Sequence, residues 1–274
     1  MNAPRERPQR SDFGARVLAA IPAIGFAIFI VVQGGWVFAL GILALGVLAL
    51  GELSVMFARV RPPMLAGMLA VAAMVCTAQQ YGDEKQVLLA LVASFPLTFF
   101  LALMRPRRQN VSWALAVTYF SVLWVGLPLV YAVLLRKLPH GDGLIVDILV
   151  GTFLGDTAAY FGGRGWGRTP LAPRISPNKT LEGAVAGFIG GTLAFWFAGL
   201  YQNWLSGRDA IVMGAFVALA APIGDLIESL DKRHLGVKDT GRFFGAHGGV
   251  LDRLDAVLFT IVAGYFAAVS LGYG

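Results

Sequence analysis

Residues 210–233 read AIVMGAFVALAAPIGDLIESLDKR, an apolar run that ends in charged residues at Asp225, Glu228, Asp231, Lys232 and Arg233. A run of about 20 apolar residues is long enough to cross the hydrocarbon core of a bilayer as a helix. Ionisable groups beside such a run are costly, which makes them candidates for function. This stretch therefore predicts a membrane-spanning helix with a functional site at its end.

The composition extends this prediction to the whole chain. Of 274 residues, 57% are hydrophobic and 14% are charged, whereas soluble domains contain about 25% charged residues. We expect no soluble module and hence no nucleic-acid partner. Cys76 is the only cysteine and lies in an apolar run, which excludes a disulfide within the chain and a thiolate metal site.

Nine apolar runs, separated by Pro, Gly and charged clusters, predict the architecture. We expect an all-α, polytopic integral membrane protein of about nine transmembrane helices, with Gly34 and Gly35 forming a hairpin turn between the first two. An N-terminal region (1–135) would hold about five spans, and a C-terminal region (136–274) about four spans with loops at 164–180 and 231–249. The runs are 15–32, 35–58, 63–80, 86–104, 111–135, 143–163, 181–203, 208–230 and 250–272.

Basic residues predict the orientation of these spans, because cytoplasmic loops retain Lys and Arg. With the N-terminus in the cytoplasm, 18 of the 22 Lys and Arg residues lie on the inner side, and only Lys85, Arg136, Lys137 and Arg208 lie outside. Many of these charges need do no more than set the topology. The asymmetry predicts a multi-pass protein of the inner (cytoplasmic) membrane, with loops 164–180 and 231–249 in the cytoplasm.

Two pairs of carboxylates lie at the cytoplasmic ends of the last two spans. Asp225 and Glu228 are three residues apart, as are Asp252 and Asp255, so each pair shares a helix face. Like charges placed in this way repel each other unless something positive lies between them.

Two explanations for the positive partner remain open. Neighbouring Lys232, Arg233 and Arg253 could neutralise the acids, with the N-terminal dipole of the last helix also favouring Asp252 and Asp255. Alternatively, hard oxygen ligands suit Mg²⁺ or Mn²⁺, which one or two carboxylates and substrate phosphates can hold. Asp225 and Asp252 are then the first choice as ligands.

Groups suited to phosphates surround these acids. Lys232, Arg233, Lys238 and Arg253 offer charge-assisted donors, and His247-Gly248-Gly249 would leave backbone N–H groups free at a helix N-terminus. Two further segments are rich in Gly, hydroxyl and basic residues, although such residues are also ordinary in loops. These are the predicted Gly-rich loop 161–168 and the segment Ser176-Pro177-Asn178-Lys179-Thr180-Leu181-Glu182-Gly183, which would cap the seventh span.

The polar residues recur in two blocks. One is Ser229-x2-Lys232-Arg233-x4-Lys238-Asp239-x-Gly241-x2-Phe244-Gly245-x-His247-Gly248-Gly249-Val250-x-Asp252-Arg253-Leu254-Asp255; the other is Asp156-x2-Ala159-Tyr160-x2-Gly163 followed by 176–183. Together they resemble the signature of the phosphatidate cytidylyltransferases, also called CDP-diacylglycerol synthases. The resemblance covers about 130 C-terminal residues closely, and Glu52 stands where an early acidic residue is usual. Asn178 replaces a common Lys, and Gly245 a frequent Pro.

The resemblance implies transfer of a cytidylyl group from CTP to phosphatidate, giving CDP-diacylglycerol and pyrophosphate, with Mg²⁺ required and Mn²⁺ or a second cation as variants. It implies a possible homodimer and a metal held by Asp225 and Asp252, with Asp255 as a further ligand or partner. We assign catalysis to Asp225, Asp252, Lys232, Arg233 and His247, and expect His247 to orient or contact phosphate. Substrate binding is assigned to Asp156, Tyr160, Ser176, Lys179, Thr180, Lys238, Asp239, Gly248, Gly249 and Arg253.

Two alternatives to this function are considered. A related membrane enzyme could use CTP on another lipid, because apolar helices say little about the lipid tail. An ion-coupled transporter also places acids in the membrane, but common transporters show inverted repeats with midplane sites. The sequence shows no such repeat, which favours the enzyme.

Overall fold

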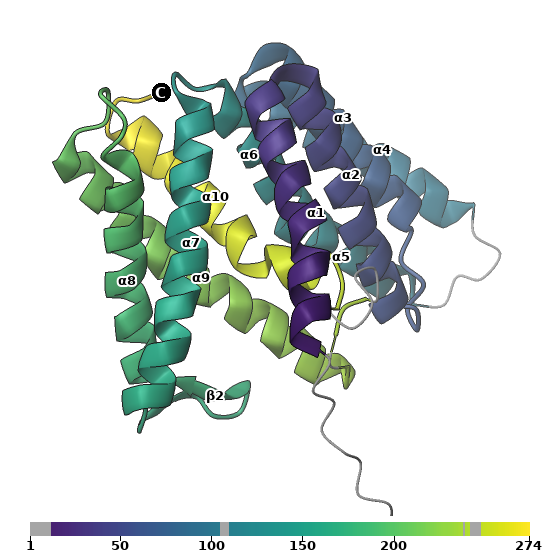
Figure 1. Ribbon diagram of the computed structural model, residues 1–274. Helices are drawn as coiled ribbons and strands as arrows, with labels where there is room; N and C mark the ends of the chain where they lie inside the picture. Colours follow the sequence, from purple (N-terminus) through teal and green to yellow (C-terminus); the bar gives the residue numbers. More distant parts are fainter. Residues whose placement is uncertain (1–11, 105–109, 238, 242–247) are drawn as a thin grey trace, which may run out of the picture.

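The computed structural model describes the backbone of residues 12–104, 110–237, 239–241 and 248–274, and side chains from Ile21 onward. It is a bundle of long helices with one small β-hairpin (Figure 1). The helices are α1 (Asp12–Gln33), α2 (Gly35–Met56), α3 (Met64–Tyr81), α4 (Glu84–Leu103), α5 (Val111–Ser121), the π-helical turn η1 (Val122–Gly126), α6 (Leu127–Lys137), α7 (Gly141–Trp166), α8 (Leu181–Gly199), α9 (Gly207–Leu235) and α10 (Leu251–Ser270).

The nine predicted runs each coincide with helix, since α5, η1 and α6 form one continuous span over Val111–Lys137. Within the described residues, eight helices are long and apolar enough to cross a membrane, and α1 adds the shorter apolar stretch Ile21–Gln33. In lipid only helices and closed barrels satisfy every backbone polar group internally. The prediction of an all-α, polytopic membrane protein is confirmed.

Large apolar side chains face outward along these helices. Val32 is 70% exposed, Phe197 is 72% exposed and Val55 is 74% exposed. A water-soluble protein rarely leaves a contiguous apolar surface of this extent uncovered, whereas lipid tails cover it without cost. The protein surface thus has the character expected of a chain surrounded by acyl chains.

Short turns join the first helices. Gly34 and Gly35 both have positive φ, at 61° and 52°, and only Gly34 separates α1 from α2. Glycine adopts this left-handed region without steric cost, so the predicted Gly-Gly hairpin is confirmed. Asp83 begins α4 by accepting a hydrogen bond from the Lys85 backbone N–H at 3.0 Å.

Glycines bring α7 and α8 into close contact. A Cβ built on Gly155 would lie 3.2 Å from the Cα of Gly191, and one on Gly191 would lie 3.0 Å from the carbonyl oxygen of Gly151. Small residues at helix interfaces allow backbones to approach closely in membranes. Cβ atoms added to Gly187, Gly190 and Gly191 would all press on α7, so these glycines serve close packing of the two helices.

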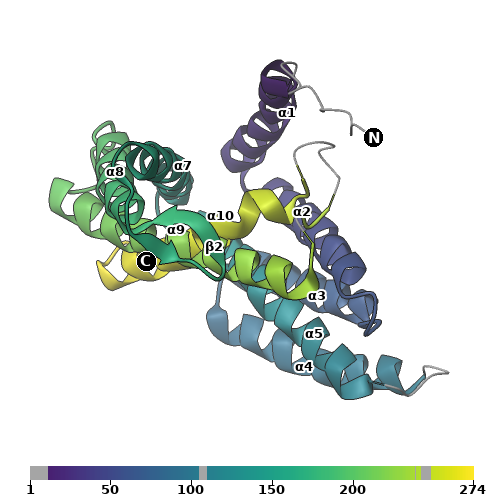
Figure 2. The ribbon, with the colours of Figure 1, turned by 90° about the horizontal axis from the view of Figure 1, so that it is seen from below.

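A β-hairpin lies between α7 and α8 and was not predicted from the sequence. Strands β1 (Pro170–Ala172) and β2 (Ser176–Thr180) pair antiparallel, with Pro170 opposite Thr180 and Ala172 opposite Ser176. Strand β2 lies against α9, as the view from this end shows (Figure 2). The hairpin folds the segment 170–180 back over the end of the bundle.

Two predicted loop boundaries were wrong. Helix α7 continues to Trp166 and α9 to Leu235, so the loops predicted to start at 164 and 231 start later. Most of the predicted Gly-rich loop 161–168 is therefore helical.

The core is shared between the two predicted regions. Helix α10 packs against α6 as well as against α7 and α9, and one cluster of buried apolar side chains contains residues from both halves. The division at residue 135 remains a prediction.

Candidate active site

The polar groups of the C-terminal region gather at the end of the bundle that carries the hairpin. The last turns of α7, α9 and α2 and the first turns of α8 and α10 meet there (Figures 1 and 2). The start of α1 lies at the same end, and the C-terminus lies at the opposite end (Figure 1). This arrangement brings residues more than 200 positions apart in the chain to one place.

Three carboxylates from three helices form an acidic cluster. Asp156 of α7 interacts electrostatically with Asp225 of α9 and Asp255 of α10, and Asp225 and Asp255 interact with each other. Lys179, at the end of β2, forms an ion pair with Asp225. Asp156 and Asp225 thus face Lys179, while Asp255 also interacts with Lys232, so three acids share two described lysines.

Lys232 lies at the centre of a second charged group. Its Nζ is 2.6 Å from Oε2 of Glu228 and 3.0 Å from Oδ1 of Asp252. The Glu228 side chain is 2% exposed and that of Asp252 is 10% exposed. Lys232 therefore joins α9 to the start of α10 through a largely buried ion pair.

Asp252 accepts hydrogen bonds through both carboxylate oxygens. The backbone N–H of Gly249 donates to Oδ2 at 2.6 Å, and the N–H of Thr240 donates to Oδ2 at 3.1 Å and Oδ1 at 3.2 Å. The Gly249 N–H is therefore not free for a phosphate, contrary to the prediction for the His-Gly-Gly segment. Asp252 is a structural centre of the loop before α10 as well as a candidate ligand.

Glu52 also lies at this end of the bundle, and its role was left open by the sequence. It lies near the end of α2, and its carboxylate accepts hydrogen bonds from the N–H groups of Val250 at 2.8 Å and Leu251 at 3.0 Å. The Thr240 hydroxyl donates to the same carboxylate at 3.3 Å. The only sequence signal was an early acid where the family resemblance places one.

Several hydrogen bonds tie the hairpin and its flanking residues to the bundle. The N-cap of α8 is Thr180, whose hydroxyl accepts from the Gly183 N–H at 3.1 Å, as expected for a capping residue. Glu182 accepts from the N–H groups of Arg168 and Thr169 at 3.1–3.2 Å. Arg233 donates through Nε to the carbonyl oxygen of Ile175 at 3.3 Å. Together they hold Lys179 over α9.

The other predicted site residues are less closely gathered. Tyr160 is 58% exposed and accepts a hydrogen bond from Arg164 at 3.0 Å. Ser176 starts β2 and is half-buried, while Asp239 and Arg253 are exposed. Gly248 has a φ of 81°, a conformation that glycine adopts readily. Lys238 and His247 lie outside the described residues.

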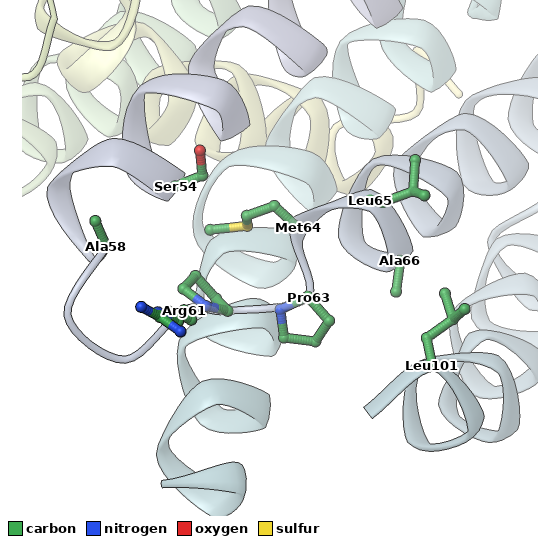
Figure 3. A pocket seen from close by; sticks show the side chains of 9 residues that line it. Ser54, Ala58, Arg61, Pro63, Met64, Leu65, Ala66 and Leu101 are labelled. Carbon is green, nitrogen blue, oxygen red and sulfur yellow. The ribbon is translucent and has the colours of Figure 1, made fainter. Parts of the chain in front are cut away.

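Two hollows lie at this end of the molecule. The smaller, of about 150 Å³, is lined by Ser229, Lys232, Arg233 and Val237, so it adjoins two predicted catalytic residues. The larger, of about 670 Å³, lies between the ends of α2, α3 and α4 and is lined by Ser54, Arg61, Met64, Leu101 and their neighbours (Figure 3). Among the predicted site residues that the structure describes, none lines this larger cavity.

A divalent cation fits the described residues in part. Among the residues that the structure describes, no three Asp, Glu, His or Cys side chains converge closely enough to hold a metal by themselves. Mg²⁺ usually needs only one or two carboxylates together with substrate phosphates. Asp225, with a side chain 36% exposed and beside Asp156 and Asp255, fits that role better than Asp252, whose oxygens already accept several hydrogen bonds.

Comparison with known proteins places this chain in a family. A model of the cytidylyltransferase family matches residues 14–271. The chain belongs to the cytidylyltransferase family.

Several bacterial phosphatidate cytidylyltransferases are similar to this chain. The phosphatidate cytidylyltransferase of Thermotoga maritima is 40% identical over 124 residues, covering 43% of the chain and 46% of the relative. That of Mycobacterium leprae is 36% identical over 167 residues, covering 60% of the chain and 53% of the relative. The chain therefore spans about half the length of these relatives. The phosphatidate cytidylyltransferase of Staphylococcus epidermidis is 34% identical over 256 residues, covering 90% of the chain and 95% of the relative.

Proposed function

We propose that the protein is a phosphatidate cytidylyltransferase, which transfers CMP from CTP to phosphatidate and releases pyrophosphate. The observation that carries this proposal is the similarity to the Staphylococcus epidermidis enzyme of that name over 95% of its length. The charged groups support it, because Lys179, Lys232 and Arg233 meet three carboxylates at one end of the bundle. Membership in the family favours this function over an ion-coupled transporter.

The proposed reaction is direct in-line attack. A phosphate oxygen of phosphatidate forms a bond to the α-phosphorus of CTP, while the bond from that phosphorus to the β-phosphate oxygen breaks and pyrophosphate leaves. The nucleophile needs little help from a base, because the second pKa of a phosphate monoester is about 6. Catalysis then rests on positioning and on neutralising charge.

The chain's own cations can supply this neutralisation. Lys232 is held between Glu228 and Asp252 and faces the hollow that Arg233 also lines, which suits contacts with the triphosphate. Lys179 is paired with Asp225 and could exchange that carboxylate for a phosphate. His247, Lys238 and Asp239 would complete the phosphate contacts, as the resemblance implies.

Mg²⁺, or Mn²⁺ in its place, belongs to the same proposal. A bound divalent ion would screen the phosphate charges and polarise the α-phosphate, and Asp225, with Asp252 or Asp255, would hold it. The position of Asp156 and Asp225 beside Lys179, with Asp255 interacting with both acids, supports such a site.

We further propose an inner-membrane location with the site facing the cytoplasm. The hairpin, the basic end of α9 and the start of α1 lie at one end of the bundle (Figure 1), in agreement with the positive-inside orientation. The homodimer implied by the resemblance belongs to this proposal and is tested by the mass of the purified protein in detergent.

One assay tests the activity. Purified protein in detergent is supplied with labelled CTP, phosphatidate and Mg²⁺ or Mn²⁺, and labelled CDP-diacylglycerol is measured. Parallel reactions with another lipid phosphate and with a lipid alcohol separate this function from that of a related CTP-dependent enzyme. Absence of product with every cation, from protein shown to be folded, would refute the proposal.

A further inference from the structure

Glu52 connects an N-terminal helix to the start of the last helix. It lies near the end of α2, about 200 residues away in the chain from the groups it contacts. Its carboxylate accepts from the backbone N–H groups of Val250 and Leu251, at 2.8 and 3.0 Å. Val250 precedes α10 and contributes no side-chain cap. Glu52 therefore caps α10 from another helix, and its negative charge is favoured at that helix N-terminus.

The same carboxylate also holds Thr240, which with Gly241, Gly248 and Gly249 makes up the described part of the segment 240–249 before α10. The Thr240 hydroxyl donates to Glu52 at 3.3 Å, while the Thr240 N–H donates to both oxygens of Asp252. Asp252 also accepts from Gly249 at 2.6 Å. Glu52 and Asp252 together therefore tie Thr240 to the residues at the start of α10, because each carboxylate accepts hydrogen bonds from both.

Two glycines show how little room is left around the Glu52 carboxylate. A Cβ added to Gly241 would lie 2.8 Å from the Glu52 Cγ and nearer still to its carboxylate. A Cβ added to Gly249 would also overlap that carboxylate. Non-bonded carbon atoms normally stay about 3.5–4.0 Å apart, so Gly241 and Gly249 both pack directly on Glu52. The carboxylate is thus fixed on both sides by backbone.

We propose that Glu52 is a positioning residue for cytidylyl transfer. It sets the positions of Thr240, Asp252 and the start of α10, and it thereby brings an N-terminal span into the construction of the site. This inference rests on the proposed function, because its kinetic test needs the CTP-dependent activity. The residues assigned to the nucleotide phosphates lie in or beside that segment, so loss of Glu52 should weaken use of CTP more than use of phosphatidate.

The principal variant is Glu52→Gln, which keeps the shape of the side chain but removes its charge. The amide offers one acceptor oxygen and turns a donor toward groups that are themselves donors. We expect kcat/KM for CTP to fall about tenfold or more, which corresponds to about 1.4 kcal/mol, with little change in KM for phosphatidate. Hydrogen exchange followed by mass spectrometry should show faster exchange at Thr240, Val250 and Leu251. Glu84→Gln, the same change at an exposed position that starts α4, should alter neither measurement.

Thr240 provides a second test, which also applies if Glu52→Gln does not fold. Thr240→Val removes the hydroxyl donor to Glu52 but keeps the N–H donated to Asp252, whereas Thr240→Ser keeps both. We expect Thr240→Val to lower kcat/KM for CTP and Thr240→Ser to restore most of it. In a folded Glu52→Gln background, Thr240→Val should add little, because the contact is already lost.

The outcomes separate this inference from the proposed function. An inactive wild-type protein would overturn the function, but exchange at Val250 and Leu251 would still report whether Glu52 orders the segment. Active wild type together with unchanged kinetics in Glu52→Gln and Thr240→Val would overturn the positioning role. So would a loss of activity without any change in exchange, because Glu52 would then act through something other than this segment.

Discussion

Lys232 should stabilise the protein as well as serve the reaction. Glu228 is 2% exposed, and one of its oxygens lies 2.6 Å from the Lys232 Nζ. The change Lys232→Met would leave that carboxylate buried beside Asp255 and Asp252, with which it interacts electrostatically. Asp252 would suffer less, because it keeps the N–H groups of Gly249 and Thr240.

The loss of folding free energy in Lys232→Met can be estimated from the burial of the Lys232–Glu228 ion pair. Breaking a buried ion pair by removing one partner costs about 3–5 kcal/mol, and the partial exposure of Lys232, at 19%, points to the lower end, about 3 kcal/mol. For chains of this size each kcal/mol shifts Tm by about 2–4 °C, so we expect Tm to fall by about 6–12 °C. Thermal unfolding in detergent, followed by tryptophan fluorescence, measures the shift.

A double variant separates stability from catalysis. Adding Glu228→Gln to Lys232→Met removes the unpaired charge, so Tm should recover most of its loss while CTP-dependent activity stays low. Lys85→Met, at an exposed site on the first turn of α4, controls for loss of a lysine. A Tm for Lys232→Met equal to that of the wild type would contradict this prediction, as would a double variant with no higher Tm than the single one.

Three further changes test other parts of the structure. Asp225→Asn should reduce turnover by at least about a hundredfold, which is the usual effect of losing one electrostatic contact at a reacting centre. Near-normal activity in the assay with labelled CTP would contradict the assignment of Asp225 as a cation ligand. Gly191→Leu should prevent close packing of α7 and α8 and cost about 1–3 kcal/mol or more, seen as a lower Tm; an unchanged Tm would refute the close contact. In a cysteine-free background, Pro173→Cys in the hairpin and Tyr201→Cys after α8 should react with an impermeant thiol reagent from opposite sides of the membrane, the first from the cytoplasm, and labelling of both from one side would refute the topology.

The spans could be predicted because lipid imposes one simple rule. A chain segment in the bilayer core must be apolar and must satisfy its own backbone hydrogen bonds, so hydropathy alone located the helices. The ends of the helices were harder to predict, because glycine occurs both in loops and where two helices pack closely. Gly162 indicated a loop, yet it lies within α7, where an added Cβ would overlap the Cβ of Ala186 in α8. At the end of α9, Gly236 with a φ of 68° marks the true C-cap, a signal that the sequence did contain.

The sequence indicated candidate residue types for the site, which stay a prediction, but it could not indicate their pairings. Spacing along one helix places Asp225 and Glu228 on one face, and in the structure Glu228 is buried while Asp225 is partly exposed. No periodic pattern could show that Lys179 would reach Asp225 from a hairpin, or that Glu52 would bind the start of α10. Such contacts depend on how distant helices pack, which a single sequence does not encode in its local periodicity.

The acids at this site therefore divide into two groups with different consequences for mutation. Glu52 and Asp252 accept backbone N–H groups and tie Thr240 to the start of α10, whereas Asp156 and Asp225 face a lysine and other acids. Loss of activity in Asp252→Asn would thus follow from a disturbed segment as readily as from a lost metal ligand, and alone it supports neither. Binding of Mn²⁺ in the absence of CTP, measured by electron paramagnetic resonance, separates them. If Asp225→Asn abolishes that binding and Asp252→Asn preserves it while exchange at Thr240 and Gly249 accelerates, Asp252 acts through the fold of its segment; if both abolish binding without faster exchange, both are ligands.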